Sequence, residues 1–190
     1  MRSTLRILSA GLLVPLALAA QQIATPVAAM PKVGDVAPDF SLAAGTMSGV
    51  SAKPVKLSDL RGKTVVIAFY PRQRSSGCTI QMMHYRDYYG DIFGKGDDVM
   101  LLAVSTDSVK DIASWAVEEK FPFTFLSDPD GATGKAYATM YGTRNMERRI
   151  LFVVAPNGKV SYVMSPFNEV DPVSYEQLTK AINDAKGMKE

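Results

Sequence analysis

The sequence contains one cysteine, Cys78, and one histidine, His84, among its 190 residues. A single cysteine excludes an internal disulfide, and it also excludes a Cys-x-x-Cys pair for disulfide exchange. With one thiol and one imidazole, and no clustered carboxylates, we expect no metal site. Cys78 is therefore a free thiol, a partner in an intermolecular disulfide, or a small buried apolar residue.

The chain also lacks a strong charge of either sign. It has 21 Lys and Arg residues and 19 Asp and Glu residues, and no basic patch or stripe is evident. Nucleic-acid-binding domains usually show such a patch, so no nucleic-acid partner is expected. A composition of 47% hydrophobic and 21% charged residues is ordinary for one globular domain.

The one long apolar run lies at the N-terminus. Residues 7–20 are uncharged and apolar, follow Arg2 and Arg6, and end in the small residues Ala17–Ala19. A membrane-spanning helix needs about 20 apolar residues, and Pro15 interrupts this shorter run. A basic start, an apolar centre and a small-residue end are typical of a signal peptide.

We therefore predict a signal peptide over residues 1–20, a flexible N-terminal tether over 21–35, and one domain over 36–190. Removal of the signal peptide would leave equal numbers of basic and acidic residues. The prediction places the mature protein outside the cytoplasm, in the bacterial periplasm. Paired cysteines often stabilise proteins in such oxidising compartments, and this chain has none.

The rest of the chain alternates between strand and helix patterns. Uninterrupted apolar runs at Thr64–Tyr70 and Val99–Ser105 predict strands that are buried on both faces. Near the C-terminus, Pro156-Asn157-Gly158 predicts the turn of a hairpin. The order of elements fits an α/β protein with a thioredoxin-like fold: a mixed central β-sheet flanked by helices, with an N-terminal β-hairpin.

Cys78 lies where the pattern changes from strand to helix. The spacing of Ile80 and Met83, with Asp87 or Tyr88, predicts a helix that begins at or just after the cysteine. Its first turn would lie at the carboxyl edge of the sheet, where α/β folds bind their ligands. Unpaired amides and the helix dipole favour a thiolate in that position.

Ionisation alone does not make a thiol a catalyst. For a cysteine at neutral pH, a pKa lowered from about 8.5 to about 6 increases the thiolate fraction roughly thirtyfold. Enzymes commonly accelerate reactions by ~10⁶-fold or more, so other groups must stabilise the developing charge. Near Cys78 the sequence offers the Ser75 hydroxyl, close backbone approach at Gly77 and a stiff turn at Pro71.

The segment "FYPRQRSSGCT" resembles the active-site loop of the peroxiredoxins, in which Pro is followed by three residues, Thr or Ser, two residues and Cys. Pro71, Ser75 and Cys78 occupy those positions. The resemblance is to the bacterioferritin comigratory protein branch in particular. It extends over roughly residues 33–185, through "KLSDLRGKTVVIAFYP", "AVSTDS", "FPFTFLSDPDG" and "RRILFVVAPNGKV".

The resemblance implies a thiol-dependent peroxidase that reduces hydrogen peroxide and organic hydroperoxides in antioxidant defence, without a cofactor. Cys78 would be the peroxidatic nucleophile and form a sulfenic acid. Ser75 would hydrogen-bond the thiolate and the peroxide, Arg149 would hold the thiolate and the transition state, and Pro71 and Gly77 would contact the substrate. Neighbouring Arg148 is a weaker candidate because adjacent strand residues face opposite ways.

The sequence departs from the family pattern at three points. Gln81 replaces the usual Glu, Met83 stands where many relatives carry a resolving cysteine, and "SSG" replaces "TPG" before Cys78. Without a second cysteine, the sulfenic acid needs an external thiol reductant, either a thioredoxin-like protein or glutathione. The sequence thus predicts a one-cysteine peroxiredoxin, as a monomer or a homodimer.

Alternatives remain at this stage. The missing resolving cysteine and Gln81 also suit a non-catalytic redox sensor or binding protein with the same fold. Arg72 and Arg74 are solvated loop residues, or their charge lowers the pKa of Cys78 or attracts an acidic reductant. His84 is expected to be structural because it lies six residues beyond Cys78, well away from it on a helix.

Overall fold

The computed structural model describes residues 29–188, so the predicted signal peptide and most of the predicted tether lie outside the described residues. The strands are β1 Ser41–Thr46, β2 Gly49–Val50, β3 Val55–Lys56, β4 Thr64–Phe69, β5 Val99–Ser105, β6 Thr124–Ser127, β7 Ile150–Val154 and β8 Val160–Met164. The helices are the 3₁₀ turn η1 Leu57–Leu60, α1 Ser76–Asp87, α2 Tyr89–Phe93, α3 Val109–Glu119, α4 Ala132–Ala136 and α5 Pro172–Lys186.

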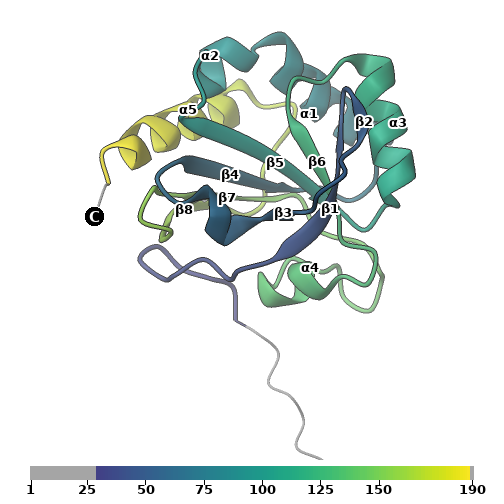
Figure 1. The fold of residues 1–190 in the computed structure, drawn as a ribbon. Helices are drawn as coiled ribbons and strands as arrows, with labels where there is room; N and C mark the ends of the chain where they lie inside the picture. The colour runs from purple at the N-terminus through teal and green to yellow at the C-terminus, as the bar shows by residue number, and fades with distance from the viewer. Residues whose placement is uncertain (1–28, 189–190) are drawn as a thin grey trace, which may run out of the picture.

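The centre of the molecule is one mixed β-sheet with helices packed around it (Figure 1). Its strand order is β2-β1-β6-β5-β4-β7-β8, and β3 pairs with β1. Strands β4, β5 and β6 are parallel, whereas β7 pairs antiparallel with β4 and β1 antiparallel with β6. Every residue of β4 is buried, as its uninterrupted apolar sequence predicts. The thioredoxin-like fold class is confirmed.

The predicted N-terminal hairpin is present as β1 and β2, which join at the pair Thr46 and Gly49. Strand β1 lies close to helix α3, and this approach requires a glycine. A Cβ at Gly45 would lie 2.8 Å from the Cα of Ala113 in α3. At the predicted boundary between tether and domain, the amide of Gly34 donates to the carbonyl of Val160 at 2.8 Å.

Two apolar clusters lie on opposite faces of the sheet. Helices α1, α2, α3 and α5 pack on one face, where Trp115 and Phe125 belong to a large aromatic group. The chain before β1, η1 and the end of α4 cover the other face, where Tyr137 packs on Phe69 and Phe152. Cys78 belongs to the first cluster, so its thiol lies between a helix and the sheet. Within residues 29–188, no helix is long and apolar enough to cross a membrane.

Helix α1 differs from its prediction in its start and in the side that it buries. It begins at Ser76, two residues before Cys78. Its inward residues are Cys78, Gln81, Met82 and Tyr85, whereas Ile80 is 47% exposed. The prediction assumed that apolar residues mark the buried side. That assumption fails here because Gln81 is a buried polar residue with hydrogen-bond partners inside the protein.

Candidate active site

The thiol of Cys78 lies at the carboxyl end of β4, in the first turn of α1. Strand β4 ends at Phe69, and a short loop reverses the chain into the helix. Two contacts hold this loop: the amide of Gln73 donates to Asp107 Oδ2 at 2.7 Å, and Arg74 forms an ion pair with Glu118 at 2.6 Å. Cys78 itself has no solvent-exposed surface. The fold thus presents one buried thiol at a helix N-terminus.

Arg149 is the charged group in contact with this thiol. Its Nη2 lies 3.5 Å from Cys78 Sγ. The contact follows from sheet register, because Ile150 pairs with Phe69 and so brings the start of β7 beside the end of β4. Arg148 is exposed and donates to the carbonyl of Ala138 at 2.6 Å. The structure therefore brings Arg149, and not Arg148, to the cysteine.

The Arg149 guanidinium has two further partners. Its Nη1 donates to Gln81 Oε1, and its Nε forms an ion pair with Glu169 Oε2 at 3.0 Å. Gln81 Nε2 then donates to the hydroxyl oxygen of Tyr85 at 2.9 Å. The amide at position 81 thus accepts from the arginine and donates to the tyrosine. A carboxylate could accept from Arg149 but could not donate to Tyr85.

Neither Glu169 nor Tyr85 was predicted from the sequence as a site residue. Glu169 lies in the segment between β8 and α5, and no local motif marks it. Tyr85 follows Gln81 by one helical turn, a spacing that could have revealed a shared face once Gln81 was known to be buried. Burial raises the pKa of Tyr85 above its usual range, so its hydroxyl stays protonated.

Gly77 lies directly beside the charged groups. A Cβ at this position would collide with Glu169 Oε1 and would lie 2.9 Å from Arg149 Nη2. A side chain at position 77 would therefore displace the ion pair, which occupies the space that glycine leaves open. The sequence predicted close backbone approach at Gly77 to a substrate, and the structure shows close approach to Arg149 and Glu169.

Ser75 is the residue before the first turn of α1, and its hydroxyl donates to the carbonyl of Arg72 at 2.9 Å. In this arrangement the hydroxyl proton points to the loop backbone. A hydrogen bond from Ser75 to a thiolate requires the hydroxyl to leave Arg72.

An open cavity of about 660 Å³ adjoins the active-site loop, with walls that include Pro71 and Ser75. Arg72, Arg144 and Met146 also line it, and no acidic side chain does. Among the described residues, neither Arg72 nor Arg144 forms an ion pair with an acidic residue, whereas Arg74 pairs with Glu118. The cavity connects solvent to the loop that carries the thiol, and its charged rim is positive.

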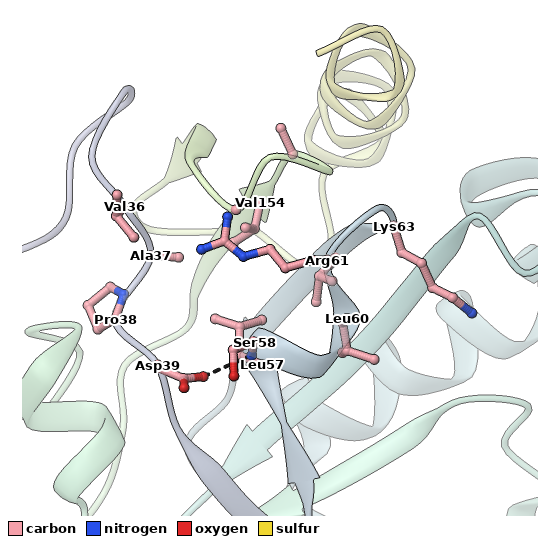
Figure 2. A pocket seen from close by; sticks show the side chains of 13 residues that line it. Val36, Ala37, Pro38, Asp39, Leu57, Ser58, Leu60, Arg61, Lys63 and Val154 are labelled. Atoms are coloured by element: carbon pink, nitrogen blue, oxygen red, sulfur yellow. Dashed lines mark hydrogen bonds between the residues drawn. The ribbon is translucent and has the colours of Figure 1, made fainter. Parts of the chain in front are cut away.

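A second cavity, of about 370 Å³, lies at the amino end of β4, away from Cys78. Figure 2 shows Arg61 and Asp39 among its labelled side chains, and a dashed line marks the bond in which the amide of Ser58 donates to Asp39 Oδ1 at 2.9 Å. Its lining contains no thiol and no imidazole. This cavity brings together none of the predicted site residues.

The single histidine takes part in packing. The ring of His84 stacks on Tyr175 at 3.7 Å between centroids and on Tyr88 at 4.6 Å. Partial burial lowers its pKa, an effect that the nearby Asp87 opposes. Its stacking partners are thus Tyr88, between α1 and α2, and Tyr175 of α5. Over residues 29–188, no group of three or more His, Cys, Asp or Glu side chains is arranged to hold a metal ion.

A buried thiol in the first turn of a helix on a thioredoxin-like sheet, in contact with an arginine that directly precedes the neighbouring strand, defines a thiol-based redox protein. A model of the AhpC/TSA family matches residues 33–163. Peroxiredoxin Bcp of Escherichia coli strain K12 is 32% identical over 142 residues, which cover 72% of this chain and 86% of that protein. The chain belongs to the AhpC/TSA family, and it is a peroxiredoxin of the bacterioferritin comigratory protein branch with a single cysteine.

Two further similarities support this assignment. Chloroplastic peroxiredoxin Q of Sedum lineare is 32% identical over 145 residues, 74% of this chain and 75% of that protein. The crystal structure of peroxidoxin BcpB from Mycobacterium tuberculosis superimposes with a TM-score of 0.67 and 26% identity, covering 82% of this chain and 99% of that one. The protein is accordingly a thiol-dependent peroxidase, and the non-catalytic alternative is not favoured.

Proposed function

We propose that Cys78 is the peroxidatic nucleophile and that Arg149 stabilises both its thiolate and the transition state. The thiolate sulfur attacks one peroxide oxygen, an S–O bond forms, and the O–O bond breaks. The sulfur is oxidised to a sulfenic acid, and the leaving oxygen takes up a proton to become water or an alcohol. Negative charge moves from sulfur to the leaving oxygen, so a fixed cation beside both atoms lowers the barrier.

The single observation that carries this proposal is the contact between Arg149 Nη2 and Cys78 Sγ at 3.5 Å. The two residues are far apart in the sequence, and only the pairing of β7 with β4 brings them together. In this proposal Pro71 and Gly77 shape the approach of the peroxide. Ser75 also contacts the peroxide once its hydroxyl has turned from the Arg72 carbonyl to the substrate.

A one-cysteine cycle follows from the single thiol of the chain. A first external thiol condenses with the sulfenic acid, which releases water and leaves a mixed disulfide. A second thiol attacks that disulfide and regenerates Cys78. A thioredoxin-like protein with two thiols, or two molecules of glutathione, can supply both steps. Comparison of turnover with each reductant separates these two sources.

We also propose that the protein acts after export, in the bacterial periplasm. The support is the N-terminal pattern of Arg2 and Arg6, an apolar run and Ala17–Ala19. Mass determination of the protein from a periplasmic extract tests this proposal. A mature N-terminus near residue 20 supports it, and an intact N-terminus in the cytoplasmic fraction contradicts it.

The central experiment is stopped-flow mixing of the reduced protein with hydrogen peroxide, with Cys78→Ser as the control. We expect Cys78 to react much faster than free cysteine at the same pH and to appear as sulfenic acid by mass spectrometry. A rate equal to that of free cysteine would contradict the proposal. In Arg149→Ala the rate should fall by about 10²-fold, as for the loss of one charge-stabilising donor, and by more than any change in thiolate fraction explains.

A further inference from the structure

The Arg149 guanidinium is held on three sides. Nη2 faces Cys78 Sγ, Nη1 donates to Gln81, and Nε pairs with Glu169 Oε2 at 3.0 Å. Of these three partners, Gln81 is neutral and Cys78 is negative only as a thiolate. Glu169 is the one that contributes a carboxylate charge whether or not the thiol is ionised. The side chains of Arg149 and Glu169 are 13% and 22% exposed, so solvent screens their interaction only in part.

Glu169 is itself held in place by the surrounding structure. The hydroxyl of Tyr175 donates to the backbone carbonyl of Glu169 at 2.8 Å. The amide of Phe167 donates to the backbone carbonyl of Arg149 at 3.0 Å, which ties the segment before α5 to the start of β7. Gly77 leaves room for the carboxylate against the first turn of α1. Three separate elements thus fix the position of this acid beside the arginine.

We propose that Glu169 is the positioning residue that sets both the direction of Arg149 and the amount of positive charge that reaches Cys78. Glu169 lies in the segment before α5 and places a carboxylate beside Arg149, where position 81 contributes only the neutral amide of Gln81. This inference rests on the proposed roles of Cys78 and Arg149, and it adds a residue that acts on the reaction through the arginine.

The two effects of Glu169 are separable by substitution. Glutamine keeps an oxygen that can accept from Arg149 Nε but removes the negative charge. Alanine removes the acceptor as well, so the guanidinium loses the partner that orients it. Removal of the charge alone strengthens the net positive field at the sulfur and favours the thiolate. Loss of orientation displaces the donor from the sulfur, and displacements of about 1 Å can cost ~10²-fold in rate.

The first experiment compares Glu169→Gln, Glu169→Ala and the matched control Glu176→Gln, in which an exposed carboxylate on α5 is replaced. Alkylation of Cys78 by iodoacetamide across pH gives the midpoint of thiolate formation. Stopped-flow rates with hydrogen peroxide are then divided by the thiolate fraction.

Glu169→Gln should shift the midpoint to lower pH by about 0.5 to 1 unit and keep the rate per thiolate within about threefold. Glu169→Ala should lower the rate per thiolate about ten- to hundredfold. The Glu176→Gln control should match the unmodified protein in both measurements.

A second pair of variants moves the carboxylate. Gln81→Glu places a second acid beside Arg149 and should shift the midpoint to higher pH. The double variant Gln81→Glu, Glu169→Gln again has one acid and should return the midpoint toward that of the unmodified protein. The charged and ionisable groups around the thiol and its arginine in this comparison are Arg149, which precedes β7, Tyr70, which follows β4, Tyr85 of α1, Tyr175 of α5 and Glu169.

The outcomes distinguish this inference from the proposed function. If Cys78 of the unmodified protein reacts no faster than free cysteine, the proposed function fails. If it reacts fast, but both Glu169 variants match Glu176→Gln in midpoint and in rate per thiolate, only the role of Glu169 is overturned. Should Glu169→Ala fail to fold, Glu169→Gln decides the matter, because an unshifted midpoint in that variant overturns the inference by itself.

Discussion

At the scale of single residues, Gly77 shows how little free space the site contains. The position is helical, and alanine normally stabilises a helix relative to glycine by roughly 0.5–1 kcal/mol. Here a Cβ would collide with Glu169 Oε1 and press on Arg149 Nη2. We expect Gly77→Ala to displace the ion pair and to lower the peroxide rate of Cys78 by at least about tenfold.

Stopped-flow kinetics with hydrogen peroxide checks this expectation, and Ser76→Ala at the exposed neighbouring position is the control. Thermal unfolding of both variants shows whether the fold is intact. A Gly77→Ala protein that is more stable than the unmodified protein and equally fast would contradict the crowding described for this position.

Some residues around Cys78 were predicted from the sequence and others were not. The motif predicted Cys78 and Ser75, and the family resemblance predicted Arg149, with Arg148 weaker because side chains alternate along a strand. The structure places Arg149 beside Cys78, whereas the Ser75 hydroxyl bonds the Arg72 carbonyl. Glu169 could not be found, because an irregular segment brings it to the site by tertiary packing alone. The buried side of α1 was wrong because a polar residue, Gln81, occupies it.

At the scale of elements, the packing of β1 on α3 depends on Gly45. A Cβ there would lie 2.8 Å from both Cα and N of Ala113, and helix backbone cannot move aside as a flexible side chain can. We expect Gly45→Ala to lower the free energy of unfolding by about 1–3 kcal/mol, the usual range for overpacking. Urea unfolding measures this change.

Gly90 in α2 provides a matched control for the same chemical change. A Cβ there would meet only the side chain of Lys95, at 3.7 Å. Gly90→Ala should therefore raise the free energy of unfolding by roughly 0.5–1 kcal/mol. Equal destabilisation by Gly45→Ala and Gly90→Ala would show that the strand and helix are not in tight contact.

The elements themselves were largely predictable from sequence. Strands such as Val99–Ser105 stand out as apolar runs. Ser108 is of the residue type that caps helices, and in the structure its hydroxyl oxygen accepts from the amide of Asp111 at the start of α3. The strand order of the sheet does not follow from such local patterns. The structure supplies that order, because pairing between distant strands depends on the whole chain.

At the scale of the whole molecule, one buried acid makes stability depend on pH. Glu147 has no exposed surface, and neither of its carboxylate oxygens has a hydrogen-bond partner among residues 29–188. Burial raises the pKa of Glu147 well above 4.5, and the nearby Asp128 and Asp107 carboxylates raise it further. Glu147 is thus protonated in the folded protein at pH values where the unfolded chain has lost that proton.

The sign of the effect follows from this difference. The stabilisation from a protonated Glu147 is complete below pH 4.5 and is lost as the pH rises toward its folded value. Within that window, the free energy of unfolding should fall by about 1.4 kcal/mol per pH unit relative to Glu147→Gln, which cannot ionise. Urea unfolding at pH 5 and pH 8 measures it, with Glu176→Gln as control. A difference between the unmodified protein and Glu147→Gln that is constant with pH would contradict the assignment.

A chain with one thiol has a fixed capacity for oxidant when no reductant is present. Each molecule should consume one molecule of hydrogen peroxide in a rapid phase, since the sulfenic acid has no second cysteine to condense with. A colorimetric peroxide assay, with peroxide in small excess over protein, measures this stoichiometry. Slower consumption of up to about two further molecules would oxidise the sulfenic acid to sulfinic and sulfonic acid, whereas consumption beyond that without added thiol would show that another group restores Cys78.

The pairing of β7 with β4 also has a consequence for the newly made chain. Cys78 lies in the first half of the sequence, whereas Arg149 and Glu169 belong to its last quarter. Arg149 reaches Cys78, and Glu169 reaches Arg149, only after the hairpin of β7 and β8 has docked on the sheet. In the proposed mechanism the thiol lacks its activating partners until then, so a chain in synthesis carries an ordinary cysteine and should gain peroxide reactivity late in folding.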